Sequence, residues 1–260
     1  MKIDFHYYAT NLAARLAGFS NEEAYIIAYS SQFVDDLTEK LVPDSPIITN
    51  YTTLHVTHMS VMEDWSENNW QKLREVYQVF HFVPGNEIYE ITYQGAKQYL
   101  TWKFQEENEE QLKELTLPSS PLVKEIVTSA VTSRNLYRIG LAAHAYADSF
   151  AHQGFAGVPW LFLNEVVNGV NLPDGSRSFK FLSRADFSNA NDSLEQLKFY
   201  ANPRMPMMKN QVYLGHNRLG NIVDYSCLKF SYTPYWHSEA GAIIRENPKE
   251  FTQCFFGLVE

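Results

Sequence analysis

Residues 144–153 read HAYADSFAHQ, in which an aspartate stands between two histidines at intervals of four. Each step of four residues advances about 40° around an α-helix and about 6 Å along it, so His144, Asp148 and His152 are predicted to line one stripe of a helix. Alanine and aromatic residues surround this stripe, which indicates a buried helix. A buried, unpaired carboxylate is costly, and no Lys or Arg follows within two turns. A cation from outside the chain is therefore the simplest partner.

The carboxylate of Asp148 has two oxygens and can bridge two cations. We therefore predict that His144 and Asp148 hold one metal ion, and that Asp148 and His152 hold a second. Imidazole together with carboxylate favours borderline divalent ions, zinc first, with iron and manganese as alternatives. The competing interpretation is a buried network of hydrogen bonds without a metal.

The helix that carries this motif is predicted to begin far upstream. Ser120 and Pro121 form a start signal, and no proline or strong turn follows until about Gly154. We therefore predict one helix of roughly 33 residues, bent at Gly140.

Most of the remaining chain also has helical patterns. Helices are predicted over residues 9–18, after the capping sequence 20–23, over 234–245, and from Pro248 to the end. A strand or hairpin is predicted at 51–62, and a charged, exposed helix or insertion at 103–115. These patterns predict a mainly α fold, a single-domain helical bundle over residues 1–260 with a small β-hairpin or loop insertions. The last helix has no C-terminal cap signal, which is typical of a fragment of a longer protein.

Composition narrows the classes of partner. The formal net charge is -9, which disfavours binding of duplex nucleic acid but not catalysis on a phosphate ester at a bound metal. Cys227 and Cys254 are too few for a disulfide framework, so a reducing compartment is expected. No signal peptide and no apolar run of about 18 residues is present, so we predict no transmembrane segment and a cytoplasmic location.

Further candidate ligands lie before the motif. Asp4 and His6 are two residues apart, so in an extended segment their side chains would point the same way. Asp35 and Asp36 end an apolar helix face, where acids oppose the helix dipole, and this placement suggests another role. His81 stands alone among apolar and aromatic neighbours in VYQVFHFVPG, and its chances of being structural or a ligand are even.

Other histidines lie after the motif or outside it. His216 lies between glycines, which allow close approach of the backbone to a site, and Asp224 follows eight positions later. His55 and His58 are predicted to be non-ligands, because a spacing of three puts them on opposite faces of a strand. His237 is a candidate by residue type alone.

Taken in chain order, His6, QFVDD, FHFVPG and HAYADSFAHQGF resemble the motifs of a known superfamily. They are similar to the mostly helical zinc-dependent phospholipases C and single-strand-specific nucleases. Over nearly its whole length, the chain is even more similar to a bacterial family of uncharacterised proteins with IDFH, VDD, HFLPG-like and HxYADxxAHQGF motifs. That second family has no established activity.

The resemblance to the phospholipases and nucleases implies up to three zinc ions and hydrolysis of a phosphodiester or phosphomonoester. Where those enzymes use an N-terminal Trp as a ligand, this chain has Met1, and Asp4 is predicted to take that place. Asp224 is predicted to replace their final acidic ligand. The remaining ligands implied by the resemblance are His6, Asp35, His81, His144, Asp148 as the bridge, His152 and His216.

The sequence therefore predicts a metal-dependent hydrolase of a small-molecule, lipid or nucleotide phosphate ester. We expect Asp36 to orient the attacking water as general base and Arg218 to contact the substrate phosphate. One alternative is a metallohydrolase acting on another bond, such as an amide. The other is a metal-stabilised binding or structural protein without catalysis, for which a closed ligand shell would be typical.

Overall fold

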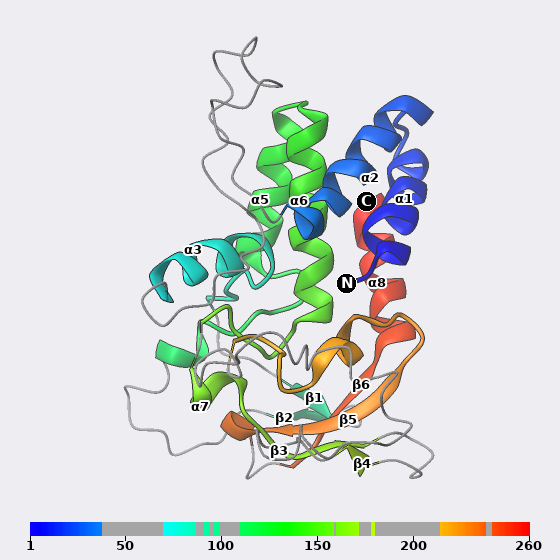
Figure 1. Ribbon diagram of the computed structural model, residues 1–260. Helices are drawn as coiled ribbons and strands as arrows, with labels where there is room; N and C mark the ends of the chain where they lie inside the picture. Colours follow the sequence, from blue (N-terminus) through cyan, green and yellow to red (C-terminus); the bar gives the residue numbers. More distant parts are fainter. Residues whose placement is uncertain are drawn as a thin grey trace.

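The computed structural model describes residues 1–37, 70–86, 91–93, 96–98, 110–158, 160–171, 178–179, 214–237 and 241–260. The predictions for 51–62, and for 103–115 up to residue 109, lie outside these ranges. Figure 1 shows helices in its upper part and a small sheet in its lower part. The prediction of a mainly α fold is confirmed.

Most of the helices precede the larger sheet in the chain, and one helix follows it. The α-helices are α1 (Thr10–Leu16), α2 (Asn21–Asp36), α3 (Trp70–Phe80), α5 (Pro121–Thr132), α6 (Leu136–Ala151), α7 (Leu161–Asn164) and α8 (Asn247–Val259). Three further turns are the π-helix η1 (Asp4–Ala9) and the 3-10 helices η6 (Gly220–Asp224) and η7 (Tyr235–His237). None of the helices in the described ranges is long and apolar enough to span a bilayer.

The strands form two antiparallel sheets. Strands β1 (Ile91–Tyr93) and β2 (Ala96–Gln98) pair with each other. The larger sheet has the order β4-β3-β5-β6, made of β3 (Val166–Asn171), β4 (Ser178–Phe179), β5 (Lys229–Pro234) and β6 (Ile243–Glu246). The helix predicted over 234–245 is thus wrong apart from the single turn η7, because IIRE at its end alternates buried and more exposed side chains as a strand does.

Helix α6 is the centre of the helical part and packs against α2, α5 and α8. Gly140 makes the closest of these contacts possible. A Cβ atom at this position would lie 2.4 Å from the carbonyl oxygen of Ile27 and 2.5 Å from Cβ of Ser30, both on α2. The absence of a side chain therefore lets α2 lie directly against α6.

The predicted long helix is in fact two helices, α5 and α6. Arg134 adopts a left-handed backbone conformation with φ of 53°, which ends the first helix. The side chain of Asn135 then accepts hydrogen bonds from the backbone N–H groups of Tyr137 and Arg138 and caps the start of α6. The Ser120–Pro121 start signal is confirmed, since Ser120 accepts a bond from the N–H of Val123.

Helix α2 begins as predicted at a capping box. The Ser20 side chain accepts from the N–H of Glu23, and the Glu23 carboxylate accepts from the N–H of Ser20. The IDFH segment, by contrast, is not extended but forms the π-helix η1. The C-terminal helix is confirmed as α8.

Candidate metal centre

The Asp148 carboxylate lies at the centre of a buried group of histidines. Its Oδ1 atom is 3.1 Å from Nε2 of His6 in η1. Its Oδ2 atom is 3.0 Å from Nδ1 of His81, which follows α3, and 3.0 Å from Nε2 of His144, four residues earlier on α6. All four side chains are nearly inaccessible to solvent. Three distant segments thus meet at one carboxylate.

A second group lies one helical turn further along α6. His152 caps the C-terminus of α6, and its Nε2 atom is 3.1 Å from Oδ1 of Asp224. Nε2 of His216 is 3.8 Å from the other oxygen of Asp224. The buried side-chain amide of Asn247 donates to the backbone carbonyls of Ile222, Val223 and Tyr225, and so holds the turn that carries Asp224.

Asp35 forms the accessible edge of the first group. It is the penultimate residue of α2, and its side chain is 31% exposed. Its carboxylate lies 3.8 Å from Nε2 of His6, from Nδ1 of His81 and from Nε2 of His144. Ligands of the buried group can therefore be approached from solvent beside Asp35.

The amino group of Met1 lies between the two groups. It is fully buried, 2.5 Å from Oδ1 of Asp148 and 3.4 Å from Oδ1 of Asp224. Burial by itself lowers the pKa of this amine, but Asp148, Asp224 and Asp35 together raise it to about 11. The amine therefore neutralises part of the carboxylate charge.

Asp4 does not take the place predicted for it. Two residues apart in η1, Asp4 and His6 point in different directions: His6 is fully buried, whereas Asp4 is exposed and its carboxylate accepts a hydrogen bond from Ser226. The amino group of Met1 lies in the cluster instead. The extended conformation assumed from the sequence caused this error.

Three of the histidines have their tautomer set by a backbone carbonyl. Nδ1 of His144 is 2.8 Å from the oxygen of Ser31, Nδ1 of His152 is 2.7 Å from that of His81, and Nδ1 of His216 is 2.8 Å from that of Gly220. A carbonyl oxygen only accepts, so each Nδ1 carries the proton. In a neutral ring, Nε2 then presents a lone pair, and in all three cases it faces a carboxylate oxygen.

Burial keeps at least two of the rings neutral. It lowers the pKa of His6 to about 3 and, with a smaller effect of nearby His152, that of His216 to about 4. Burial by itself raises the pKa of Asp148, but His152, the Met1 amine, His144 and His6 together hold it well below its usual range. His216 combines both properties: the lone pair on Nε2 of its neutral ring faces the charged carboxylate of Asp224, an arrangement that is repulsive unless a cation lies between them.

The geometry defines three groups that could each hold a metal ion, two of which share His144. Within each group, one ligand atom per residue lies within 4.8 Å of the others. The groups are His6, His144 and Asp148; Asp35, His81 and His144; and His152, His216 and Asp224. The structure therefore brings together every predicted metal ligand except Asp4.

The predicted catalytic residues lie outside these groups. Asp36 is exposed and accepts a hydrogen bond from Gln32, one turn earlier on α2. Arg218 follows His216 closely, but its guanidinium donates to Glu165 at 2.8 Å. His237 is buried near Gly241, apart from the three groups. His55 and His58 lie outside the described residues.

Sequence reasoning missed the groups that orient the ligands. The carbonyl of Ser31, the amide of Asn247 and the amine of Met1 carry no motif, and only the tertiary fold brings them to the site.

Comparison with known proteins identifies the family. A family of unknown function (DUF6765) matches residues 1–260, so the chain belongs to this family over its full length. Neither the curated proteins nor the solved structures contain a match to the chain.

Proposed function

We propose that this member of a family of unknown function is a metal-dependent hydrolase that cleaves a phosphate ester at a multinuclear, zinc-type site. The observation that carries the proposal is the geometry of His144, His152 and His216, whose Nε2 atoms face carboxylate oxygens while each Nδ1 faces a backbone carbonyl. Histidines that ligate metals commonly donate their other N–H to a carbonyl or carboxylate, as these three do.

The donor set favours zinc. Imidazole nitrogen and carboxylate oxygen are typical ligands of zinc, and no described cysteine lies among them. Iron and manganese accept the same ligands and stand as alternatives. The amine of Met1, once deprotonated, would offer one more nitrogen next to Asp148 and Asp224.

Charge supports an anionic substrate. The three carboxylates are those of Asp35, Asp148 and Asp224, while burial keeps His6 and His216 neutral. Two divalent cations would bring four positive charges against these three negative ones. The loaded site would then have a net positive charge in a poorly hydrated setting, which favours a phosphate group over a neutral amide.

The accessible edge supports catalysis over a purely structural role. A structural metal site is closed by protein ligands, whereas a catalytic site keeps a position open. Asp35 is 31% exposed, while the Asp148 carboxylate behind it is 1% exposed. A substrate would therefore enter beside Asp35.

Different groups of the chain would bind the metal, orient its ligands and position the attacking water. A bound divalent cation would supply a water of lowered pKa and polarise a phosphoryl oxygen. The Ser31 carbonyl would keep His144 in the tautomer that presents Nε2, and Asn247 would hold Asp224 in place. A role of Asp36 as general base would require its carboxylate to turn from Gln32 towards Asp35.

The test is hydrolysis of bis(4-nitrophenyl) phosphate and 4-nitrophenyl phosphate by protein purified without chelator. We expect the wild type to cleave at least one of them, and His144→Ala to lose at least about 100-fold in turnover, because an outer-shell change alone costs 10- to 100-fold. Arg138→Ala, an exposed change on the same helix, is the matched control and should retain activity.

The outcomes separate the alternatives. Bound metal without cleavage of either ester would favour the metal-stabilised structural or binding protein. Cleavage that survives both chelation and His144→Ala would remove the site from the reaction altogether.

A further inference from the structure

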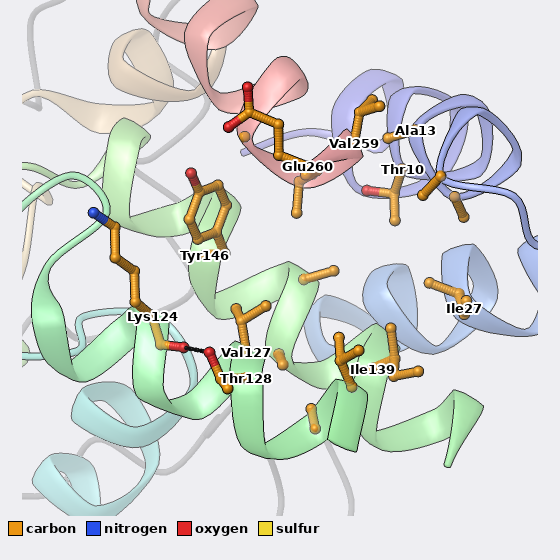
Figure 2. Close-up of a pocket in the computed structure, with 18 of the residues that line it drawn as sticks. Thr10, Ala13, Ile27, Lys124, Val127, Thr128, Ile139, Tyr146, Val259 and Glu260 are labelled. Carbon is orange, nitrogen blue, oxygen red and sulfur yellow. Dashed lines mark hydrogen bonds between the residues drawn. The ribbon is translucent and has the colours of Figure 1, made fainter. Parts of the chain in front are cut away.

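The face of α6 opposite the metal groups borders a cavity of about 730 Å³. It lies between α1, α5, α6 and the end of α8, and Figure 2 shows residues that line it. His144 and Asp148 point to the metal groups, while Ala142 and Tyr146 of the same helix line the cavity. The described candidate ligands do not line the cavity, so it is a separate feature of the fold.

Most of the cavity wall is apolar. Aliphatic side chains from four helices, α1, α2, α5 and α6, form its interior: Ala13, Ala14, Ile27, Val127, Ala130, Ile139 and Ala142. Protein interiors contain few voids larger than a water molecule. The volume instead falls within the range of small-molecule pockets, about 300–1,000 Å³. Such a space is suited to an occupant from outside the chain.

Water is poorly matched to this wall. The hydroxyl of Thr10 donates to the carbonyl of Phe5, that of Thr128 to Lys124 and that of Thr132 to Thr128. These donors are therefore used within their own helices. Thr128 and Thr132 are exposed, so the rim of the cavity is open to solvent, but a water deeper inside needs two to four polar partners, which the aliphatic inner wall does not supply.

The charged residues that line the cavity lie at one end of it. In Figure 2, Lys124, Tyr146 and Glu260 lie at one end, and Ile27 and Ile139 lie towards the other. The Lys124 ammonium is exposed and has three donors for an oxygen at the mouth. The cavity thus combines an apolar length with one polar mouth.

We propose that this cavity binds a single hydrocarbon chain with one small oxygen-bearing head group, a carboxylate or a hydroxyl. The chain would lie along Ala13, Ile27 and Ile139, and the head group would accept a hydrogen bond from Lys124. This binding site does not depend on the proposed phosphoesterase activity.

The test is calorimetric titration of the full chain with decanoate and with 1-decanol, each below its aggregation concentration. We expect one molecule to bind per chain. Val127→Trp fills the cavity and should weaken binding by at least about tenfold. Ser129→Trp, an exposed change on the same helix α5, is the matched control and should leave the affinity within about twofold.

Lys124→Met identifies the head group. Weaker binding of decanoate with unchanged binding of 1-decanol would assign a fatty acid, and equal weakening of both would show that Lys124 donates a hydrogen bond to either head group. Unchanged binding of both probes would overturn the placement of the head group at Lys124.

A chain-length series keeps the proposal testable if Val127→Trp fails to fold. From octanoate to dodecanoate, affinity for the wild type should rise about fourfold per methylene, because each CH₂ leaves water. An affinity that is flat with chain length, or no binding of either probe to folded wild type, would overturn the proposal.

Discussion

Helix α6 has two buried faces, a polar face that carries His144 and Asp148 and an apolar face that carries Ala142 and Tyr146. One presents His144 and Asp148 to polar partners at distances close to 3 Å, and the other presents Ala142 and Tyr146 to an open cavity. The first face has surplus negative charge, whereas the second has space and almost no charge. Two equally buried faces of one helix can therefore suit different ligands. A cation would balance the charge of the polar face, and a hydrocarbon would fill the space beside the apolar face.

The largest expected effect comes from removing the central carboxylate. Asp148→Ala should lower the number of metal ions bound per chain, measured by plasma mass spectrometry on protein purified without chelator, because Asp148 is a ligand of one group and contacts histidines of the other two. It would also leave the buried Met1 ammonium without its nearest partner, at a cost of about 3–5 kcal/mol in the free energy of unfolding.

Asp4→Ala is the matched control for that experiment. It removes another carboxylate, but one that is exposed and held by Ser226. This variant should keep its metal and its stability. An unchanged metal content in Asp148→Ala, or a loss of metal in Asp4→Ala, would contradict the assignment of the polar face.

The polar face should also make stability depend on pH, which the apolar face cannot do. The folded pKa values of His6 and His216 are about 3 and about 4, below the usual 6.5. Between the usual pKa of 6.5 and these lower folded values, the two histidines are protonated in the unfolded chain but not in the folded chain. The free energy of unfolding therefore falls as the pH falls through this range. In metal-free protein the expected slope is about 1.4 kcal/mol per pH unit for each histidine.

Urea unfolding in chelator at several values between pH 7 and pH 4.5 measures this slope. His216→Gln should make it shallower, since one titrating group is gone. A stability that is constant over this interval would mean that the rings take up protons at the same pH in the folded and the unfolded chain, and the electrostatic case for a metal would fail.

A smaller effect is expected where the polar face meets α2. Gly140→Ala introduces a Cβ only 2.4 Å from the Ile27 carbonyl and should push α2, with Ser31 and Asp35, away from α6. Overpacking of this kind costs about 1–3 kcal/mol, although alanine is the better helix former. Metal affinity should fall about 10- to 100-fold, as for loss of an outer-shell contact. Arg138→Ala, on the exposed side of α6, is the control in both the unfolding and the metal titrations.

The contrast between the two faces also explains what the sequence could reveal. A spacing of four places His144, Asp148 and His152 on one stripe of any helix, so this prediction needed only local geometry. The prediction for Asp4 also rested on local geometry alone. It was wrong because it assumed an extended segment where the chain forms a π-helix. Contacts such as that of Met1 with Asp148, 147 residues apart, depend on tertiary packing and leave no local pattern.

The secondary structure likewise could be predicted only where a local sequence signal was strong. The capping box at Ser20 and the start at Ser120 are local signals, and the structure bears both out. The break between α5 and α6 depends on Asn135 as a cap, a signal that was present but was outweighed by the absence of proline. Strand β6 is only four residues long, Ile243–Glu246, too short for its alternation to stand out from a helical pattern.

The smallest expected effect compares one substitution on the two faces. Ala142 lines the cavity, whereas Ala147 is fully buried in the core between the helices. Ala→Val carries the same loss of helix propensity at both sites, so the difference between the two variants reports packing alone. Ala147→Val should lower the free energy of unfolding by about 1–3 kcal/mol through overpacking. Ala142→Val adds methyl groups to empty space and should range from no change to a gain of about 1 kcal/mol, since each buried methylene contributes about 0.8 kcal/mol. Equal losses at both sites in urea unfolding would show that the cavity closes in solution, and the two faces of α6 would then differ in charge alone.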